Sequence, residues 1–141
     1  MNQLIILHQD TYGIGVGLPG KVDVENGVAI FQNNIPWANF PIVERLKETY
    51  GDIPVKIDND VKVAAYAEYR LLNLKPTDMF GYVTVSTGIA ATNIVNNTIL
   101  RGEGFSGEIG FVKVPYFECL DSLEVACSGV GIERTGREIY E

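Results

Sequence analysis

This chain of 141 residues has little histidine and cysteine, and fewer basic than acidic residues. Its single histidine, His8, and its two cysteines, Cys119 and Cys127, have neither the spacing of metal ligands nor that of a disulfide framework. We therefore expect reduced, buried thiols. Lysine and arginine are scattered without a basic run, and the net charge is −7. This balance argues against nucleic acid or an anionic membrane surface as a partner.

Long apolar runs are also missing. The N-terminal residues carry no positively charged segment, and their apolar run is too short for a signal peptide. No stretch approaches the length of a membrane span. We expect a cytoplasmic protein, in which Asn96-Asn97-Thr98 forms a hairpin turn rather than a glycosylation site.

The composition that remains is that of a globular protein, with 46% hydrophobic and 21% charged residues. The length is that of one ordinary domain and suffices for a core. Residue patterns predict, in chain order, a strand at 12–18, a hairpin through 22–31, a polar loop at 32–38, a helix at 40–50, a strand at 53–57 and a helix from 61 to about 72.

Residues 75–78, Lys-Pro-Thr-Asp, are the expected boundary between two parts, 1–74 and 75–141. The pattern after the boundary predicts strands at 79–86, 89–95 and 99–100, a glycine-rich loop at 101–110, and helices at about 120–127 and from 128 onward.

Asp58-Asn59-Asp60 is the place where the chain looks built for chemistry. The three residues follow a strand and precede an alanine-rich helix, where open α/β sheets place ligands. A carboxylate with an adjacent amide there can fix a hydroxylated substrate and take its proton. The alternative is that Asp58 or Asp60 only caps the helix. One cap needs one residue, so three in a row slightly favour a site.

Three further constellations have structural alternatives. The run from Gly15 to Gly20 matches G-x-G-x-x-G, but Pro19-Gly20 predicts a turn and strand where a dinucleotide site needs a helix. Ser86-Thr87-Gly88 is either a phosphate-binding turn or an ordinary tight turn. Glu108 is a solvated loop residue unless other polar side chains converge with it. The side chains that would make a sugar pocket with it are Asn34, Asn59, Asp60 and Glu124.

The order of these segments resembles the ROK family of bacterial sugar kinases and sugar-responsive repressors. The matching runs are GIGVGLPGKVDVENG at 13–27, NIPW at 34–37, IDNDVKVAAYAE at 57–68, STGI at 86–89, LRGEGFSGEIG at 100–110 and LEVACSG at 123–129. The resemblance covers nearly the whole chain from residue 12. It implies an α/β fold of the actin-like, hexokinase-like (ribonuclease H-like) two-lobed type, represented by its central portion. Residues 1–74 would then belong to the N-terminal lobe and 75–141 to the C-terminal lobe.

The resemblance implies a role for each candidate residue. Asp60 would be the general base that deprotonates a sugar hydroxyl before attack on the γ-phosphate of ATP, with Mg²⁺ as the metal of the full-length kinase. Asn34, Asn59 and the Gly20 region would hold hydroxyls. Two carboxylates, Glu108 and Glu124, would close the sugar site. Thr87 and Gly88 would belong to a phosphate-binding turn.

The chain departs from the family pattern in several respects. Nothing before Tyr12 resembles the family's Asp-x-Gly-Gly-Thr phosphate loop, and the C-terminal half that completes the nucleotide site is not in the sequence. Residues 90–92 are Ala-Ala-Thr where the family commonly has glycines. Phe111 stands in place of the zinc-binding His, and residues 115–122 carry only Cys119. We therefore expect no zinc.

Three hypotheses follow from the resemblance. In the first, the full protein phosphorylates a hexose or N-acylhexosamine. In the second, the chain is the sugar-sensing effector domain of a transcriptional regulator of the xylose or N-acetylglucosamine repressor type. In the third, it is a truncated gene product without activity. Under each hypothesis we expect no catalysis by the 141 residues alone. We also expect self-association into a homo-oligomer.

Overall fold

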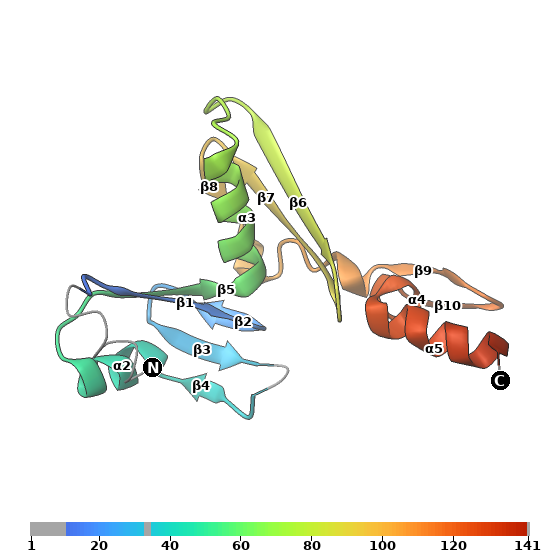
Figure 1. Cartoon of the computed structure of the whole chain (residues 1–141), viewed down its shortest axis with the longest axis horizontal. Coiled ribbons are helices and arrows are strands. Elements are labelled where there is room, and N and C mark those ends of the chain that lie inside the picture. The colour runs from blue at the N-terminus through green and yellow to red at the C-terminus, as the bar shows by residue number, and fades with distance from the viewer. Residues whose placement is uncertain (1–10, 33–34, 141) are drawn as a thin grey trace. The chain divides into compact units, whose positions relative to one another are not determined.

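A computed structural model describes residues 11–32 and 35–140 of the chain. They form two compact units, each with strands and helices of its own (Figure 1). The division falls between Val63 and Ala64, inside helix α3 (Asp60–Leu71). The lobe boundary expected at 75–78 concerns a larger fold and stays a prediction.

The first unit combines a parallel strand pair with a small antiparallel sheet. Strand β1 (Ile14–Leu18) runs parallel to β5 (Val55–Asn59), with Leu18 opposite Asn59. The antiparallel sheet has the order β2-β3-β4 and consists of β2 (Lys21–Asp23), β3 (Val28–Phe31) and β4 (Ala38–Phe40). Since β2, not a helix, follows Pro19-Gly20, the exclusion of a dinucleotide fingerprint is confirmed.

The turn of the β2–β3 hairpin is held by one side chain. The backbone and side-chain N–H groups of Asn26 donate to the carboxylate of Asp23 over 3.0 and 2.8 Å. These hydrogen bonds hold the pKa of Asp23 below its ordinary value, and the bond from the Asn26 side chain has the larger effect. Gly27 follows with φ 72°, and a Cβ there would lie 2.6 Å from Cγ2 of Val43, so the hairpin and helix α2 can approach closely.

Helix α2 (Ile42–Tyr50) ends where the sequence predicts but begins two residues later than expected, because Phe40 belongs to strand β4. Pro41 occupies the N-cap position, and Gly51 ends the helix with φ 77° and donates its N–H to Lys47 O over 2.8 Å. Its apolar face completes the core of the first unit. The buried members of that core are Leu18, Ala29, Ile42 and Ile57. Trp37 and Phe40 stack beside it with ring centroids 4.3 Å apart.

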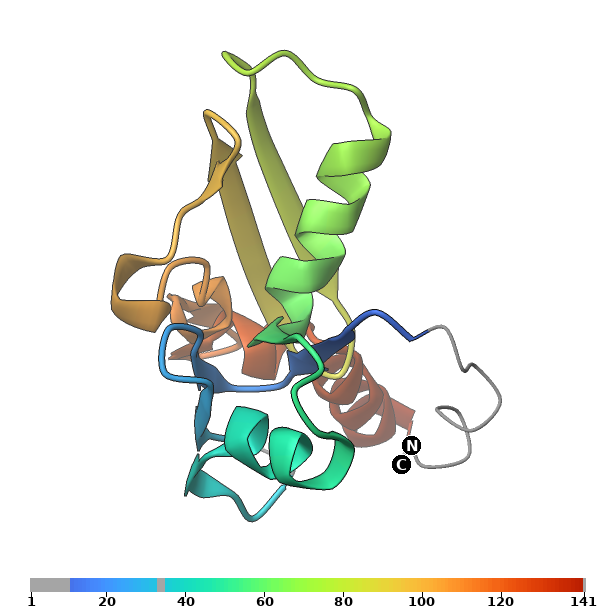
Figure 2. The same cartoon turned by 90° about the vertical axis from the view of Figure 1, so that its left-hand side faces the viewer.

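The second unit is built on a three-stranded antiparallel sheet of order β6-β7-β8. Its strands are β6 (Met79–Val85), β7 (Ile89–Val95) and β8 (Thr98–Ile99). The part of α3 from Ala64 onward runs alongside the β6–β7 hairpin (Figure 2). Tyr69 from this helix is 5% exposed, its ring centroid lies 5.8 Å from that of Phe80, and its hydroxyl donates to Asn97. These contacts join the helix to the sheet.

The rest of the second unit follows the glycine-rich loop. It contains the 3₁₀ turns η1 (Gly102–Gly104) and η2 (Ile109–Phe111), strands β9 (Lys113–Tyr116) and β10 (Cys119–Ser122), and helices α4 (Leu123–Cys127) and α5 (Gly129–Tyr140). Strands β9 and β10 form an antiparallel hairpin. The hydroxyl of Tyr116 on β9 makes a 2.5 Å hydrogen bond with Thr135 on α5, which fixes the hairpin to the helix.

The structure corrects three expectations. The helix expected from about residue 120 begins at Leu123, because Cys119–Ser122 pairs with β9 and Ser122 Oγ caps α4 by accepting the N–H of Val125 over 3.2 Å. Residues 38–40, not expected as a strand, pair with β3 as β4. Both cysteines, Cys119 and Cys127, are free but exposed, not buried, because the hairpin and the end of α4 leave them at the surface.

Within the ranges 11–32 and 35–140, no helix is long and apolar enough to cross a membrane.

Thr92 on β7 provides a test of the packing of the second unit. Its side chain is 1% exposed and its Oγ1 has no hydrogen-bond partner, so the buried hydroxyl costs free energy. We expect Thr92→Val to raise the free energy of unfolding by about 1 kcal/mol in urea denaturation. Thr98→Val is the control, because that exposed hydroxyl donates to Asn96 O. A destabilised Thr92→Val variant would show that the hydroxyl has a partner.

Candidate functional site

Asp58-Asn59-Asp60 lies where β5 ends and α3 begins, as the sequence predicts. Asn59 is the residue that caps the helix, because its Oδ1 accepts the backbone N–H of Lys62 over 3.2 Å. Its Nδ2 donates to Gly20 O over 3.1 Å and to Leu18 O over 3.5 Å. One amide therefore caps α3 and fixes the turn after β1.

The two aspartates beside Asn59 have different surroundings. Asp58 is half-buried, and its Oδ1 accepts the N–H of Asn59 over 2.8 Å. Asp60 is exposed, and its Oδ1 accepts the N–H of Val61 over 2.9 Å. Because Asn59 supplies the cap, the carboxylate of Asp60 remains accessible at the helix N-terminus, where negative charge is stabilised.

Two glycines allow the backbone to come close to this corner. A Cβ at Gly17 would lie 3.3 Å from Cα of Asp60, so strand β1 passes directly beside the first residue of α3. Gly20 has φ 77°, and a Cβ there would collide with Phe31 O. The Gly20 turn, a predicted sugar contact, is therefore placed against the end of β3 within the same unit as Asp60.

Gln32 is a polar residue at this corner that the sequence analysis did not single out. It is 4% exposed, its Nε2 donates to Lys21 O over 3.5 Å, and its Oε1 has no partner. A Cβ on Gly20 would lie 3.1 Å from its Cα. The sequence signal that could have identified Gln32 is its position directly after strand β3. Asn34, the predicted sugar contact two residues further along the chain, lies outside the described residues.

In the second unit, the structure brings the predicted phosphate turn and Glu124 together. Ser86-Thr87-Gly88 connects β6 and β7, with the N–H of Ser86 donating to Gly88 O over 2.8 Å. The next N–H, that of Ile89, donates to Oε2 of Glu124 over 2.9 Å. A Cβ on Gly88 would lie 2.5 Å from the same oxygen. The carboxylate of Glu124 therefore packs directly on the turn.

Glu108 precedes the 3₁₀ turn η2 and is half-buried. Its backbone carbonyl accepts the N–H of Phe111 over 3.3 Å. The loop before it is joined to β7, because Ala91 donates its N–H to Gly107 O over 2.7 Å. Glu108 is thus held on an ordered turn close in sequence to Gly110, whose Cβ position is 3.2 Å from Oε2 of Glu124.

No group of three or more His, Cys, Asp or Glu side chains that could hold a metal occurs in the part of the chain that the structure describes. Phe111, which stands where the resemblance has a zinc-binding His, is 71% exposed. The expected lack of zinc stays a prediction.

Comparison with known proteins agrees with the resemblance. The model of the ROK family matches residues 3–138. The chain is 35% identical over 105 residues to the xylose repressor of Bacillus subtilis and 32% identical over 137 residues to the glucokinase of Halalkalibacterium halodurans. The aligned segments cover 74% and 92% of this chain but 27% and 41% of those relatives, so the chain spans less than half of their length.

A solved structure agrees with the fold. The ROK family glucokinase from Streptomyces griseus, in complex with glucose and AMPPNP, matches with a TM-score of 0.75 and 25% sequence identity. The match covers 97% of this chain and 48% of that one. With a family match over residues 3–138 and this structural likeness, the chain belongs to the ROK family and has part of its actin-like, hexokinase-like α/β fold.

Proposed function

We propose that the chain is the sugar-binding portion of a ROK carbohydrate kinase. The full protein would transfer the γ-phosphate of ATP to a hydroxyl of a hexose or N-acylhexosamine. The observation that carries this proposal is the division of roles at the end of β5. Asn59 caps α3, which leaves the exposed carboxylate of Asp60 accessible to a substrate hydroxyl.

Asp60 is the proposed general base. Phosphoryl transfer depends mainly on positioning and charge stabilisation, with one carboxylate orienting the nucleophile and accepting its proton. The other proposed sugar contacts of the first unit are Asn34, Asn59 and the Gly20 turn. Those of the second unit are Glu108 and Glu124. Because the amide of Asn59 also holds Gly20 O, we expect it to act on the sugar partly by shaping that turn.

The proposed donor contacts are Thr87 and Gly88. ATP would supply the phosphoryl group and Mg²⁺ would offset the charge of its phosphates. The turn fits part of this role, since Ser86 and Thr87 are both exposed and carry hydroxyl donors. The N–H of Ile89 already donates to Glu124, so phosphate would be held by the remaining groups of the turn. Among solved relatives, the Streptomyces griseus glucokinase was obtained with glucose and AMPPNP.

The sugar-sensing domain of a ROK regulator is the second candidate. The observation that favours it lies on β7, where Ala90, Ala91 and Thr92 replace the glycines of the resemblance. Thr92 is buried, and a Cβ on Gly107 would collide with Ala91 O. The space around this part of β7 is therefore already occupied by protein atoms. Side chains here leave less space for phosphate. The likeness to the xylose repressor is compatible with this function.

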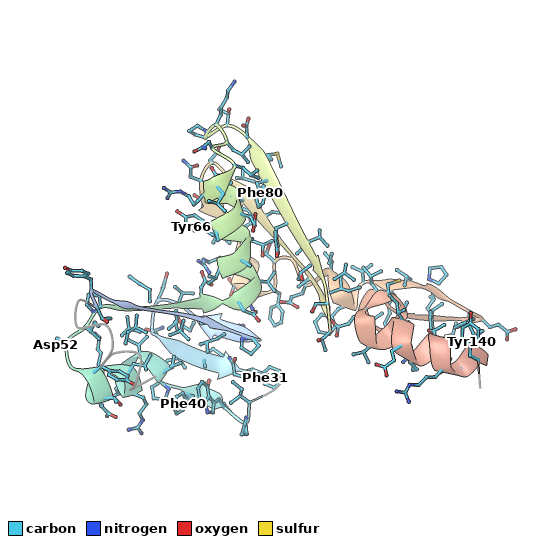
Figure 3. The ribbon with its side chains drawn as sticks, viewed as in Figure 1. Phe31, Phe40, Asp52, Tyr66, Phe80 and Tyr140 are labelled. Carbon is cyan, nitrogen blue, oxygen red and sulfur yellow. The ribbon has the colours of Figure 1, made fainter. Side chains whose placement is uncertain are left out.

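A homo-oligomer is also part of the proposal. Helix α5 ends in Tyr140, which is 91% exposed (Figure 3), and carries Ile132 and Ile139 with more than half of each side chain exposed. Apolar surface of this kind favours association with a second polypeptide.

Asp60→Asn in the full-length protein tests the proposed base. The amide keeps the size of the carboxylate and one acceptor oxygen, but it is neutral and cannot take the proton. We expect ATP-dependent phosphorylation of glucose to fall by about 10²–10⁴-fold while glucose affinity, measured by calorimetry, changes little.

Asp52→Asn, an exposed aspartate of the same unit (Figure 3), is the matched control and should keep full activity. Equal loss of sugar binding in Asp60→Asn would make Asp60 a sugar ligand instead of a base. A wild-type protein that binds sugar without forming an ATP-dependent product would favour the regulator.

Asn59→Ala tests the division of roles at the end of β5. Loss of the helix cap and of the bond to Gly20 O should lower the free energy of unfolding by about 1–2 kcal/mol in urea denaturation. Asp60→Ala removes a carboxylate that, among the residues the structure describes, accepts only the N–H of its neighbour Val61. This variant should lower the free energy of unfolding by less than about 1 kcal/mol. Equal losses in the two variants would contradict the assignment of Asn59 as the cap.

A further inference from the structure

The carboxylate of Glu124 is tied to the turn between β6 and β7. Glu124 lies in the first turn of α4, and this helix sits beside the end of the β6–β7 hairpin (Figure 1). Its Oε2 accepts the N–H of Ile89, the first residue of β7, over 2.9 Å. Ile89 is 5% exposed, so the bond lies at the edge of the packed interior.

Two glycines make room for this carboxylate. A Cβ on Gly88 would lie 2.5 Å from Oε2 of Glu124, and a Cβ on Gly110 would lie 3.2 Å from the same atom. The Cβ position of Gly110 is also 2.5 Å from Ile89 O. A side chain at either position would therefore displace Glu124 or the strand. The backbone around the turn is shaped to receive the carboxylate.

The other end of the turn is held from the same corner of the fold. Gly129, the first residue of α5, donates its N–H to Ser86 O over 2.8 Å. Ser128 is 2% exposed and caps α5, since its Oγ accepts the N–H of Gly131 over 3.2 Å. The turn is thus held at Ser86 by the start of α5 and at Ile89 by the first turn of α4. Only Thr87 and Gly88 lie between these two points.

Glu124 has capacity for one more interaction. A carboxylate has two oxygens, and Oε1 accepts no hydrogen bond from the residues that the structure describes. Oε2 already accepts the N–H of Ile89. A sugar hydroxyl that donates to Oε1 would therefore bind the same carboxylate that holds the turn. Hydrogen bonds to a charged carboxylate are stronger than neutral ones, which makes this contact effective in fixing the turn.

We propose that Glu124 is a positioning residue that couples the sugar contact to the phosphate turn. Through Oε2 it holds the Ser86-Thr87-Gly88 turn in the conformation that receives the donor phosphate, and through Oε1 it accepts a sugar hydroxyl. Sugar binding immobilises the carboxylate and thereby stiffens the turn before the donor binds. The inference rests on the proposed function, because it assigns the sugar and the phosphate to those two places.

Amide hydrogen exchange of Ile89, followed by NMR on the 141-residue chain, tests the contact. In Glu124→Ala the Ile89 amide should exchange about tenfold faster than in the wild type, because a hydrogen bond to a charged group is lost. The amide of Val83, in the middle of β6, should be unaffected. Glu118→Ala removes an exposed carboxylate of the same unit and should leave Ile89 unchanged. Unchanged exchange in Glu124→Ala would overturn the contact.

Glu124→Gln keeps an oxygen acceptor and separates positioning from loss of folding. Its Ile89 amide should stay protected, but the proton resonance should move upfield because a neutral acceptor bonds more weakly than a carboxylate. This readout holds even where Glu124→Ala fails to fold. An Ile89 resonance identical to that of the wild type would show that the carboxylate is not its partner.

Glucose added to the wild-type chain tests the coupling. We expect Ile89 exchange to slow by at least about twofold at saturation, and this response to disappear in Glu124→Ala. Glucose that binds without changing Ile89 exchange would overturn the coupling. If glucose and N-acylhexosamines produce no thermal shift, the proposed function fails and the coupling fails with it. Faster Ile89 exchange in Glu124→Ala would in that case still establish Glu124 as the residue that holds the turn.

Discussion

The amide of Asn59 is the contact on which the first unit depends. It caps α3 through Lys62 N–H and holds the carbonyl groups of Leu18 and Gly20 at the end of β1. One side chain thus joins a strand, a helix and a turn, and supplies an acceptor to an N–H of the first turn of α3, which has no partner within the helix. The accessible carboxylate of Asp60 is a consequence, because the helix needs no second cap.

The second unit uses the same physical solution with a different side chain. Glu124, from the first turn of α4, holds the N–H of Ile89, while Gly129 holds Ser86 O from the start of α5. In both units, polar groups at the beginning of a helix fix a turn that belongs to another element. Glycines allow the close packing of both turns, since a side chain would collide with Phe31 O at Gly20 in one unit and with Glu124 at Gly88 in the other.

Much of the fold could be predicted from local patterns. Helix α2 between Pro41 and Gly51 and the β6–β7 hairpin follow from periodicity and turn residues. Strand β10 could not be predicted, because Cys119–Ser122 is extended only through its pairing with β9. Such pairing depends on residues distant enough that local propensity does not encode it. The exposure of Cys127 likewise depends on what packs around α4.

By itself, the sequence determined the family, the place of Asp58-Asn59-Asp60 between a strand and a helix, and the glycine-rich turns, because these depend on residue order and on local backbone preference. Only the tertiary structure decided which of the three residues caps the helix. It also decided that Glu124 lies on the turn at Gly88 and that Gln32 and Thr92 bury oxygens without partners. Those outcomes depend on distances between segments far apart in the chain, and hydrogen bonding is specific to such distances.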